Sequence, residues 1–513
     1  MPVRTVRTIA LSAAAVVLIG LCGINLAFGS PFVHSWDEVD FAYALDRYDL
    51  LAMQPHFPGY PYFIAGAAAI HRWIADPVRS LTVFNAMLAL SSSFPIALLA
   101  RRWVGAIPAW WATVWVAMSP YLWLMGSRAM SECAGIAVLW WYLWSVRESA
   151  DKPRSAWKHI VAVSLFGLLM GIRLSFFPFG VGLVLLWALR FRSYGSHENR
   201  FVRLGAWVVA ASAAQAVWIG GLIMSEGTPA GFWKLSKAFV AGHFSEWGGG
   251  VAATRMPILE RMATIFGDHL IGDVLLSRSV DLGIFYLILL AAIVWGVWTL
   301  RGERAARHPE MTYAMWLGVG LAAYAIWALL GQNVEKPRHI APVAGPILLA
   351  IYIVAVRLIG RLWRASADRR GSLRVVAAAI GMTLAGVYAT EAIHGFQLLE
   401  RQAAQKPAVY QLHDYLSSME QPFVVYTWEE TRVLGYLGAS YEHRRIVTFD
   451  YFRALSGAAP GSRVLLTDHV LKGFLSQNPE AGAYVRPIAH FRSESLFEPV
   501  YAEITLYEWK KPV

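Results

Sequence analysis

Charged residues and cysteines are both scarce in this chain. Asp, Glu, Lys and Arg make up 15% of its 513 residues, whereas 57% are hydrophobic and the mean hydropathy is +0.45. Too few polar side chains remain to cover a soluble protein, so the composition excludes that class and predicts a polytopic membrane protein. The two cysteines, Cys22 and Cys133, both lie in apolar segments. Their number and positions exclude a disulfide framework and a cysteine metal site.

The basic residues lack the clustering that nucleic-acid binding requires. The formal net charge is +11, but Lys and Arg are spread over six connections between hydrophobic segments, without a basic patch interleaved with aromatic residues. We therefore expect no nucleic-acid partner, and a lipid bilayer is the expected environment.

Long hydrophobic runs predict eleven membrane spans, judged against a hydrocarbon core of about 30 Å. The first run is interpreted as a retained helix, because no small-residue cleavage site stands clearly before Ser30. A shorter apolar stretch at 60–74 predicts a helix lying at the interface, anchored by Arg72 and Trp73. The predicted spans are 6–28, 81–100, 104–122, 131–146, 158–174, 176–190, 204–224, 281–299, 312–331, 339–357 and 374–391.

Lys and Arg are divided unequally between the two sets of short connections. One set, which includes the N-terminus, holds 21 of them, and the opposite set holds four. By the positive-inside rule the first set is cytoplasmic. We therefore expect a multi-pass protein of the plasma (inner) membrane, with its N-terminus in the cytoplasm and its C-terminus outside.

This topology predicts two regions: a transmembrane domain at 1–391 with outer loops 29–80 and 225–280, and an extracytoplasmic domain at 392–513. In the second region, β-rich runs alternate with helix-like stretches, which predicts a small α/β domain of mainly parallel strands. Asp450 and Asp468 stand at strand ends without a glycine-rich loop, so they are interpreted as turn and cap residues. The predicted strands are 423–427, 445–450, 464–468 and 502–507, and the predicted helices are 430–437 and 469–476.

Ionisable residues are nearly absent from the middle of the predicted spans and gather at their outer ends. Transporters coupled to protons or ions usually need such groups near the midplane. The outer ends lie at the depth of the head group of a membrane-anchored substrate. We therefore expect a site at the outer interface.

Three acidic residues follow the first span, in Ser35-Trp36-Asp37-Glu38-Val39-Asp40. Asp37 and Glu38 are the candidate catalytic residues, because a carboxylate can accept a proton from an attacking hydroxyl; the alternative is a solvated loop or a helix cap. Cations at the same depth can hold a phosphate and stabilise a leaving group, although arginines there also snorkel to the interface. The candidate substrate-binding residues are Asp40, His56, Arg128, Glu132, Arg173, Lys336, Arg338 and His339.

Five motifs accompany these candidates: Trp36-Asp37-Glu38, Gln54-Pro55-His56-Phe57-Pro58-Gly59-Tyr60-Pro61, Ser119-Pro120 to Arg128 with Ser131-Glu132, Gly171-Ile172-Arg173-Leu174, and Lys336-Pro337-Arg338-His339-Ile340-Ala341-Pro342. In combination the chain resembles the GT-C superfamily of integral membrane glycosyltransferases. The resemblance is to the branch related to protein O-mannosyltransferases and aminoarabinose transferases, and it covers about residues 1 to 390.

The resemblance implies an inverting transfer of a hexose or pentose from a polyprenyl-phosphate-linked donor, on the outer face of the membrane. The acceptor would be a hydroxyl of a glycan, a lipid or a protein. Asp37 would be the general base, and Glu38 would orient the acceptor or a loop. No cofactor is expected, and no metal, because the outer loops carry no His/Asp cluster with ligand spacing.

Two points leave alternatives open. Several relatives have Lys-Pro-Pro where this chain has Gly59-Tyr60-Pro61, so the phosphate contact of that lysine would pass to His56, Arg128 or Arg338. The alternative function is a non-catalytic lipid-linked saccharide transporter or an export-associated membrane protein, although the spans offer few polar residues to line a path. A protein whose outer tail only binds polysaccharide would leave the Asp-Glu pair without a role.

Overall fold

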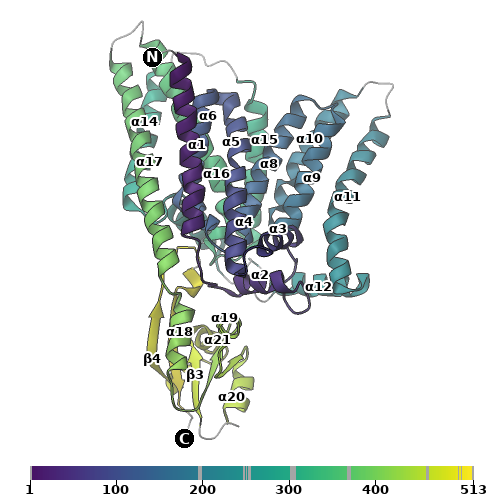
Figure 1. Cartoon of the computed structure of the whole chain (residues 1–513), viewed down its shortest axis with the longest axis vertical. Coiled ribbons are helices and arrows are strands. Elements are labelled where there is room, and N and C mark those ends of the chain that lie inside the picture. The colour runs from purple at the N-terminus through teal and green to yellow at the C-terminus, as the bar shows by residue number, and fades with distance from the viewer. Residues whose placement is uncertain are drawn as a thin grey trace.

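The computed structural model describes residues 3–194, 199–245, 249, 251, 256–300, 308–366, 371–457, 462–494, 496–497 and 499–510. Figure 1 shows a bundle of long helices with a small sheet domain beyond one end of it. The N-terminus lies at the far end of the bundle, and the C-terminus lies in the sheet domain.

Long apolar helices form the bundle, and every predicted span overlaps at least one of them. By length and composition, eight helical segments of the described chain are able to cross a membrane, and two shorter apolar helices, Ala106–Met118 and Ala156–Ile172, accompany them. The protein is therefore a multi-pass membrane protein, while the total of eleven spans stays a prediction. The bundle helices are α1 (Val3–Ala27), α4 (Pro77–Ser91), α5 (Ser93–Val104), α6 (Ala106–Met118), α8 (Ser131–Asp151), α9 (Ala156–Ile172), α10 (Val181–Ser193), α11 (Arg200–Glu226), α14 (Val280–Thr299), α15 (Met311–Gly331), α16 (Ala344–Ala365) and α17 (Ser372–Ala404).

The outer surface of this bundle carries large apolar side chains. Val16, Met224, Leu287 and Val354 are among the exposed ones. Such a surface is stable in lipid, where apolar side chains need no burial and each helix satisfies its own backbone hydrogen bonds. The interior is packed around buried aromatic residues such as Trp115.

Short helices close the end of the bundle that faces the sheet domain. Figure 1 shows α2 (Trp36–Asp46), α3 (Pro61–His71) and α12 (Pro229–Ser245) at this end. Helix α3 confirms a helix within 60–74, and Pro61 at its first position has a φ already suited to a helix. Its predicted position at the membrane interface stays a prediction. Further short elements, α7 (Pro120–Gly126), η1 (Leu174–Gly180), α13 (Ile258–Met262), a π-helix η2 (Ala263–Leu275), η3 (Pro337–His339) and η4 (Ala341–Val343), connect the long helices.

The sheet domain has five strands in the order β2-β1-β3-β5-β4. The strands β1, β2 and β3 are parallel, whereas β5 pairs antiparallel with both β3 and β4. The prediction of mainly parallel strands is thus right for one half of the sheet. The strands are β1 (Phe423–Thr427), β2 (Glu442–Arg445), β3 (Arg463–Thr467), β4 (Val485–Arg492) and β5 (Glu503–Trp509), and the helices are α18 (Ala408–Ser417), α19 (Glu430–Tyr436), α20 (Phe449–Gly457) and α21 (Asp468–Gln477), with the short turns η5 (Pro479–Tyr484) and η6 (Pro499–Tyr501).

Two of the differences from the predicted strands have a physical cause. The predicted strand 445–450 is wrong: β2 ends at Arg445, and α20 begins at Phe449, whose ring packs inward with Phe452. Strand β4 is absent from the predicted strands, and it contains Pro487. Proline is tolerated there because β4 is an edge strand with an irregular register between Pro487 and Ala489.

Helix α17 joins the two parts of the molecule. It runs without a break through the predicted domain boundary at residue 391 and ends at Ala404, after which α18 leads into the sheet. The division of the chain at 391 stays a prediction.

Candidate active site

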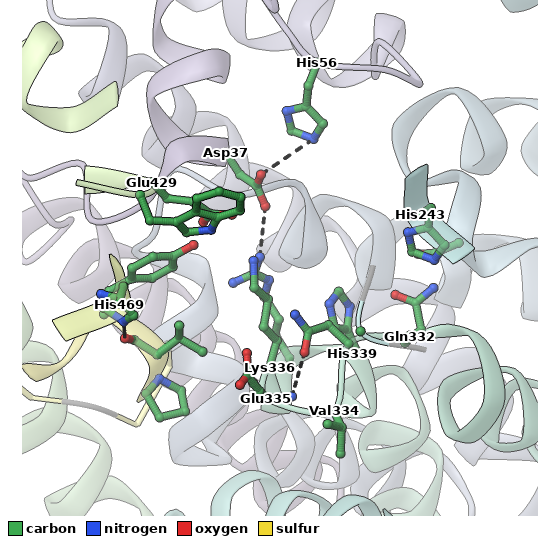
Figure 2. A pocket seen from close by; sticks show the side chains of 18 of the residues that line it. Asp37, His56, His243, Gln332, Val334, Glu335, Lys336, His339, Glu429 and His469 are labelled. Carbon is green, nitrogen blue, oxygen red and sulfur yellow. Dashed lines mark hydrogen bonds and ion pairs between the residues drawn. The ribbon is translucent and has the colours of Figure 1, made fainter. Parts of the chain in front are cut away.

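A pocket of about 1260 Å³ lies where the end of the bundle meets the sheet domain. Its walls come from the start of α2, the loop before α3, the segment between α15 and α16, and helix α12. The sheet domain adds the segments that follow β1 and β3. Figure 2 shows the side chains that point into it.

Asp37 is the part of the acidic motif that faces the pocket. It lies in the first turn of α2, with Ser35 in the N-cap position. Its side chain is 29% exposed, and its Oδ2 lies 3.0 Å from Nη2 of Arg338. Its Oδ1 lies 3.8 Å from Nε2 of His56 on the other side. The carboxylate is therefore held between two cationic groups and open to the pocket.

The charges around Asp37 set its ionisation. Burial favours the neutral acid, but the positive charges of His56, Lys336, Arg338 and Arg173 outweigh it and hold the pKa of Asp37 well below its ordinary value. Asp37 is thus a carboxylate at neutral pH, and it can accept a proton.

His56 connects Asp37 to a second, fully buried carboxylate. Its Nδ1 lies 3.0 Å from Oδ2 of Asp40, and its Nε2 lies 3.2 Å from the hydroxyl of Tyr60. Burial lowers the pKa of the His56 ring, but Asp37 and Asp40 raise it more. Gly59 shapes this loop: its φ is +84°, and a Cβ there would lie 2.5 Å from Leu222.

Glu132 holds two guanidinium groups side by side. Its Oε1 lies 2.7 Å from Nη2 of Arg173 and 2.7 Å from Nε of Arg338. Arg173 also donates to the hydroxyl of Ser131 at 2.9 Å. All three charged side chains are buried, so one carboxylate fixes two cations at the floor of the pocket. Such a pair is suited to a phosphate.

Lys336 and His339 lie in the pocket on the same segment as Arg338. Among the described residues, no carboxylate forms an ion pair with the Lys336 ammonium, which lies 5.7 Å from the centre of the Tyr501 ring. Burial and the neighbouring cations Arg338, Arg173 and Lys336 lower the pKa of His339, so its ring is neutral. The segment therefore offers one accessible cation beside a buried one.

Buried side chains behind this segment hold its backbone. Nε2 of His269 lies 2.6 Å from the carbonyl oxygen of Val334, and Nη2 of Arg261 lies 2.5 Å from that of Gln332. Asp273 in turn accepts from Nδ1 of His269 at 2.9 Å. The backbone of the segment that carries Lys336 and Arg338 is thus held in place by these hydrogen bonds.

The other predicted residues lie behind the pocket. Glu38 is fully buried: its Oε1 lies 2.8 Å from Nε of Arg128, and its Oε2 accepts from the backbone N–H of His34 at 2.5 Å. This geometry suits the predicted role of orienting a loop. Asp37, His56, Arg173, Lys336, Arg338 and His339 line the pocket, whereas Glu38, Asp40, Arg128 and Glu132 support it from behind.

The wall that the sheet domain contributes is absent from the predicted site. Trp428, Glu429 and Glu430 follow β1, and His469 follows β3. Asp468, interpreted as a cap residue, opens α21, accepts from the N–H of Thr505 and also lines the pocket. The available signal was that these polar residues follow two predicted strands, where parallel sheets bind ligands.

An apolar wall closes the opposite side of the pocket. It consists of Phe57, Phe177, Phe239, Phe244 and Trp327, from the loop before α3, η1, α12 and α15. The pocket therefore combines a charged floor with an aromatic wall next to the bundle.

The described residues contain no group of three or more His, Cys, Asp and Glu side chains that could hold a metal ion. That the reaction needs no metal or cofactor stays a prediction.

Comparisons with known proteins identify the fold. No family model matches the chain, and no curated protein matches it. Among solved structures, ArnT from Cupriavidus metallidurans is similar over the whole of both chains when bound to undecaprenyl phosphate, with 11% identity and a TM-score of 0.52. In its apo state the values are 13% and 0.53 over 98% of each chain. The apo oligosaccharyltransferase of Archaeoglobus fulgidus is 13% identical, with a TM-score of 0.51 over 96% of this chain and 74% of that one.

Identities this low establish a shared fold. The predicted fold class, a polytopic α-helical protein of GT-C type with a C-terminal α/β domain, is confirmed.

Proposed function

Because the chain has the fold of the GT-C membrane glycosyltransferases, we propose that it transfers a sugar from a polyprenyl-phosphate-linked donor to an acceptor hydroxyl. The transfer takes place on the outer face of the membrane and inverts the anomeric centre, with Asp37 as the general base. The observation that carries the proposal is an ionised, pocket-facing Asp37 held 3.0 Å from a buried arginine. Lys336 and Arg173 line the same pocket.

The floor of the pocket supports a site for the donor phosphate. Arg173 and Arg338 are fixed by Glu132, and Lys336 is accessible beside them. As the bond between the anomeric carbon and the phosphate oxygen breaks, negative charge grows on the leaving phosphate. Cations already in place stabilise that charge without reorganising, which lowers the barrier.

Asp37 supplies the other half of the reaction. The acceptor oxygen forms its bond to the anomeric carbon on the face opposite the leaving phosphate, and its proton passes to the Asp37 carboxylate. The resting Asp37 is a weak base, because surrounding cations lower its pKa. A bound phosphate offsets those cations and attracts Arg338, so donor binding raises the pKa of Asp37 and strengthens the base.

The aromatic wall supports a polyprenyl carrier. Phe239, Phe244 and Trp327 line the pocket from α12 and α15. ArnT, which shares the fold, was crystallised with undecaprenyl phosphate. An isoprenoid chain buried along such a wall would be held by its apolar area.

The test is a transfer assay on purified protein with a panel of undecaprenyl-phosphate hexoses and pentoses. Asp37→Asn keeps the size of the side chain but removes the proton acceptor, so turnover should fall by about 10²-fold or more, while donor binding survives. Asp46→Asn is the matched control, since Asp46 lies on the same helix and its side chain is 70% exposed. It should leave turnover unchanged.

Three other outcomes would contradict the proposal. Near-full activity of Asp37→Asn with loss of activity in Asp40→Asn would move the base to Asp40. Full activity in both variants would remove the role of the acidic motif. Movement of intact lipid-linked saccharide without any transfer would favour the transporter alternative.

A further inference from the structure

The sheet domain forms a wall of the pocket directly beside Asp37. Trp428 and Glu429 follow β1, and His469 follows the neighbouring parallel strand β3. Figure 2 shows Glu429 next to Asp37, with His469 on the same side of the pocket. The carboxyl ends of parallel strands are where open α/β sheets bind ligands.

Hydrogen bonds fix this wall in one conformation. The backbone N–H of Trp428 donates to Oε2 of Glu430 at 2.8 Å, and Oε1 of Glu430 lies 2.6 Å from Nδ1 of His469. Nε2 of His469 donates to the carbonyl oxygen of Val500 at 3.0 Å. Glu430 and His469 are thus paired with each other, and their hydrogen bonds connect the segments that follow β1 and β3 with Val500.

Trp428 and Glu429 are neighbouring side chains of this wall that line the pocket. The guanidinium of Arg445 lies 4.3 Å from the centre of one Trp428 ring, and the indole also lines the pocket. Among the described residues, none forms a hydrogen bond or ion pair with the Glu429 carboxylate. Burial raises the pKa of Glu429. The positive charge of Lys336 lowers this pKa and the negative charge of Asp37 raises it, and the net effect is a raised pKa. An aromatic surface therefore stands next to an uncommitted carboxyl group.

We propose that Trp428 and Glu429 form the acceptor subsite and that the acceptor group bound there is an uncharged sugar ring. The proposal rests on the glycosyltransferase function and deepens it. The C–H face of a sugar packs against the electron-rich face of an indole, and its hydroxyls donate to a carboxylate. With the sugar held in this way, a further hydroxyl faces Asp37 and is aligned for attack on the donor.

The surrounding chemistry favours a sugar over other acceptor groups. On this side of the pocket the carboxyl groups of Asp37, Glu429 and Asp468 outnumber the ammonium of Lys472, and the excess negative charge disfavours a phosphorylated or carboxylated group. The aromatic residues suited to a lipid chain, such as Phe239 and Trp327, come from the bundle and not from the sheet domain. The acceptor is accordingly carbohydrate at the point of transfer.

Saturation-transfer NMR on the full chain in nanodiscs tests the subsite directly. The probes are methyl α-D-mannopyranoside, methyl β-D-galactopyranoside and methyl α-D-arabinofuranoside. We expect at least one to bind wild-type protein, Trp428→Ala to abolish binding, and Glu429→Gln to weaken it about 10-fold, as expected for loss of a hydrogen bond to a charged group. Asp450→Asn, an exposed carboxylate of the same domain, should have no effect.

The proposal is wrong if no glycoside binds the wild type, or if both variants bind as the wild type does. Direct binding of a short Ser/Thr peptide, in the absence of glycoside binding, would make the acceptor a protein.

A kinetic experiment separates this inference from the proposed function. With the best-bound glycoside as acceptor, Glu429→Gln should raise KM for the acceptor about 10-fold and leave kcat and undecaprenyl-phosphate binding near wild type. Transfer that is insensitive to both variants would overturn the subsite alone. The protein could instead bind glycoside through Trp428 and Glu429 but transfer no sugar. That result would support the subsite and contradict the proposed transferase activity.

Discussion

The carboxylate of Asp40 lies 2.8 Å from Nε of Arg432, a residue 392 positions later in the chain. Asp40 belongs to the helix that carries Asp37, and Arg432 belongs to α19 of the sheet domain. Nη2 of Arg432 also donates to the carbonyl oxygen of Met53 at 3.0 Å. The sheet domain therefore docks on the elements that position Asp37 and His56.

Removing the ion pair between Arg432 and Asp40 should destabilise the site, although neither residue lines the pocket. Arg432→Ala leaves the buried Asp40 with His56 alone, and breaking a buried ion pair costs about 3–5 kcal/mol. The Arg432 side chain is 21% exposed, so we expect a smaller loss than this, about 1–3 kcal/mol. Thermal unfolding should show the loss, and turnover should fall with it.

The exposed Arg453 provides the control for this experiment, because Arg453→Ala removes the same type of side chain from the same domain. Equal effects of the two substitutions would contradict a specific docking role for Arg432.

The proposed orientation predicts which surfaces are reached from outside the cell. After Cys22 and Cys133 are replaced by Ala, Glu480→Cys in the sheet domain should react with a membrane-impermeant maleimide in intact cells. Lys152→Cys, at the connection between α8 and α9, should react only after lysis. Both positions are exposed in the folded protein. The reverse pattern would put the pocket on the cytoplasmic side and overturn the outer-face reaction.

The sequence predicts the parts of this structure that depend on local composition. Long apolar runs gave helices at every predicted span, because a helix is the structure by which such a run satisfies its backbone in lipid. The charged residues predicted at one end of the spans likewise come together in space. Asp37, Arg173 and Arg338 do line one pocket.

The sequence does not show which of the candidate side chains face the pocket. Asp37, Glu38 and Asp40 lie within one turn of α2, yet they point to Arg338, Arg128 and Arg432 respectively. Their separation depends on contacts with partners between 90 and 392 positions away. The wall from the sheet domain was missed for the same reason, since docking of that domain against α2 brings Glu429 beside Asp37.

The ion pair between His469 and Glu430 makes the stability of the sheet domain depend on pH. Burial lowers the pKa of His469, but Glu430, and to a smaller extent Asp468, raise it from 6.5 to about 9. A raised histidine pKa stabilises the folded state fully below about pH 6.5, and this contribution disappears as the pH rises through about 9. The Tm difference between wild type and His469→Gln should therefore shrink between pH 7 and pH 10.

His490→Gln serves as the control, because His490 is exposed on β4. Its Tm difference from wild type should stay constant over this range. A difference for His469→Gln that is also constant would show that the ring carries no extra charge in the folded state.

Lys336 and Arg338 should respond differently to removal, although both line the pocket. Arg338 is 1% exposed and contacts both Glu132 and Asp37, so Arg338→Ala should destabilise the fold by about 3–5 kcal/mol. Replacing Glu132 and Arg338 together by Gln also leaves the buried Arg173 without its carboxylate, so this double variant should be less stable than Arg338→Ala and should not restore donor binding. Thermal unfolding of the two proteins compares the stabilities.

Lys336→Ala should leave stability nearly unchanged and weaken binding of undecaprenyl phosphate about 10- to 100-fold, since a charge-assisted hydrogen bond contributes about 1.5–3 kcal/mol. The loss should decrease in high salt, because an accessible charge is screened. Lys472→Ala is the matched control, because Lys472 lines the same pocket from α21 of the sheet domain. If Lys472→Ala weakens binding as much as Lys336→Ala does, or if Lys336→Ala has no effect, the phosphate is not held by the segment that carries Lys336 and Arg338.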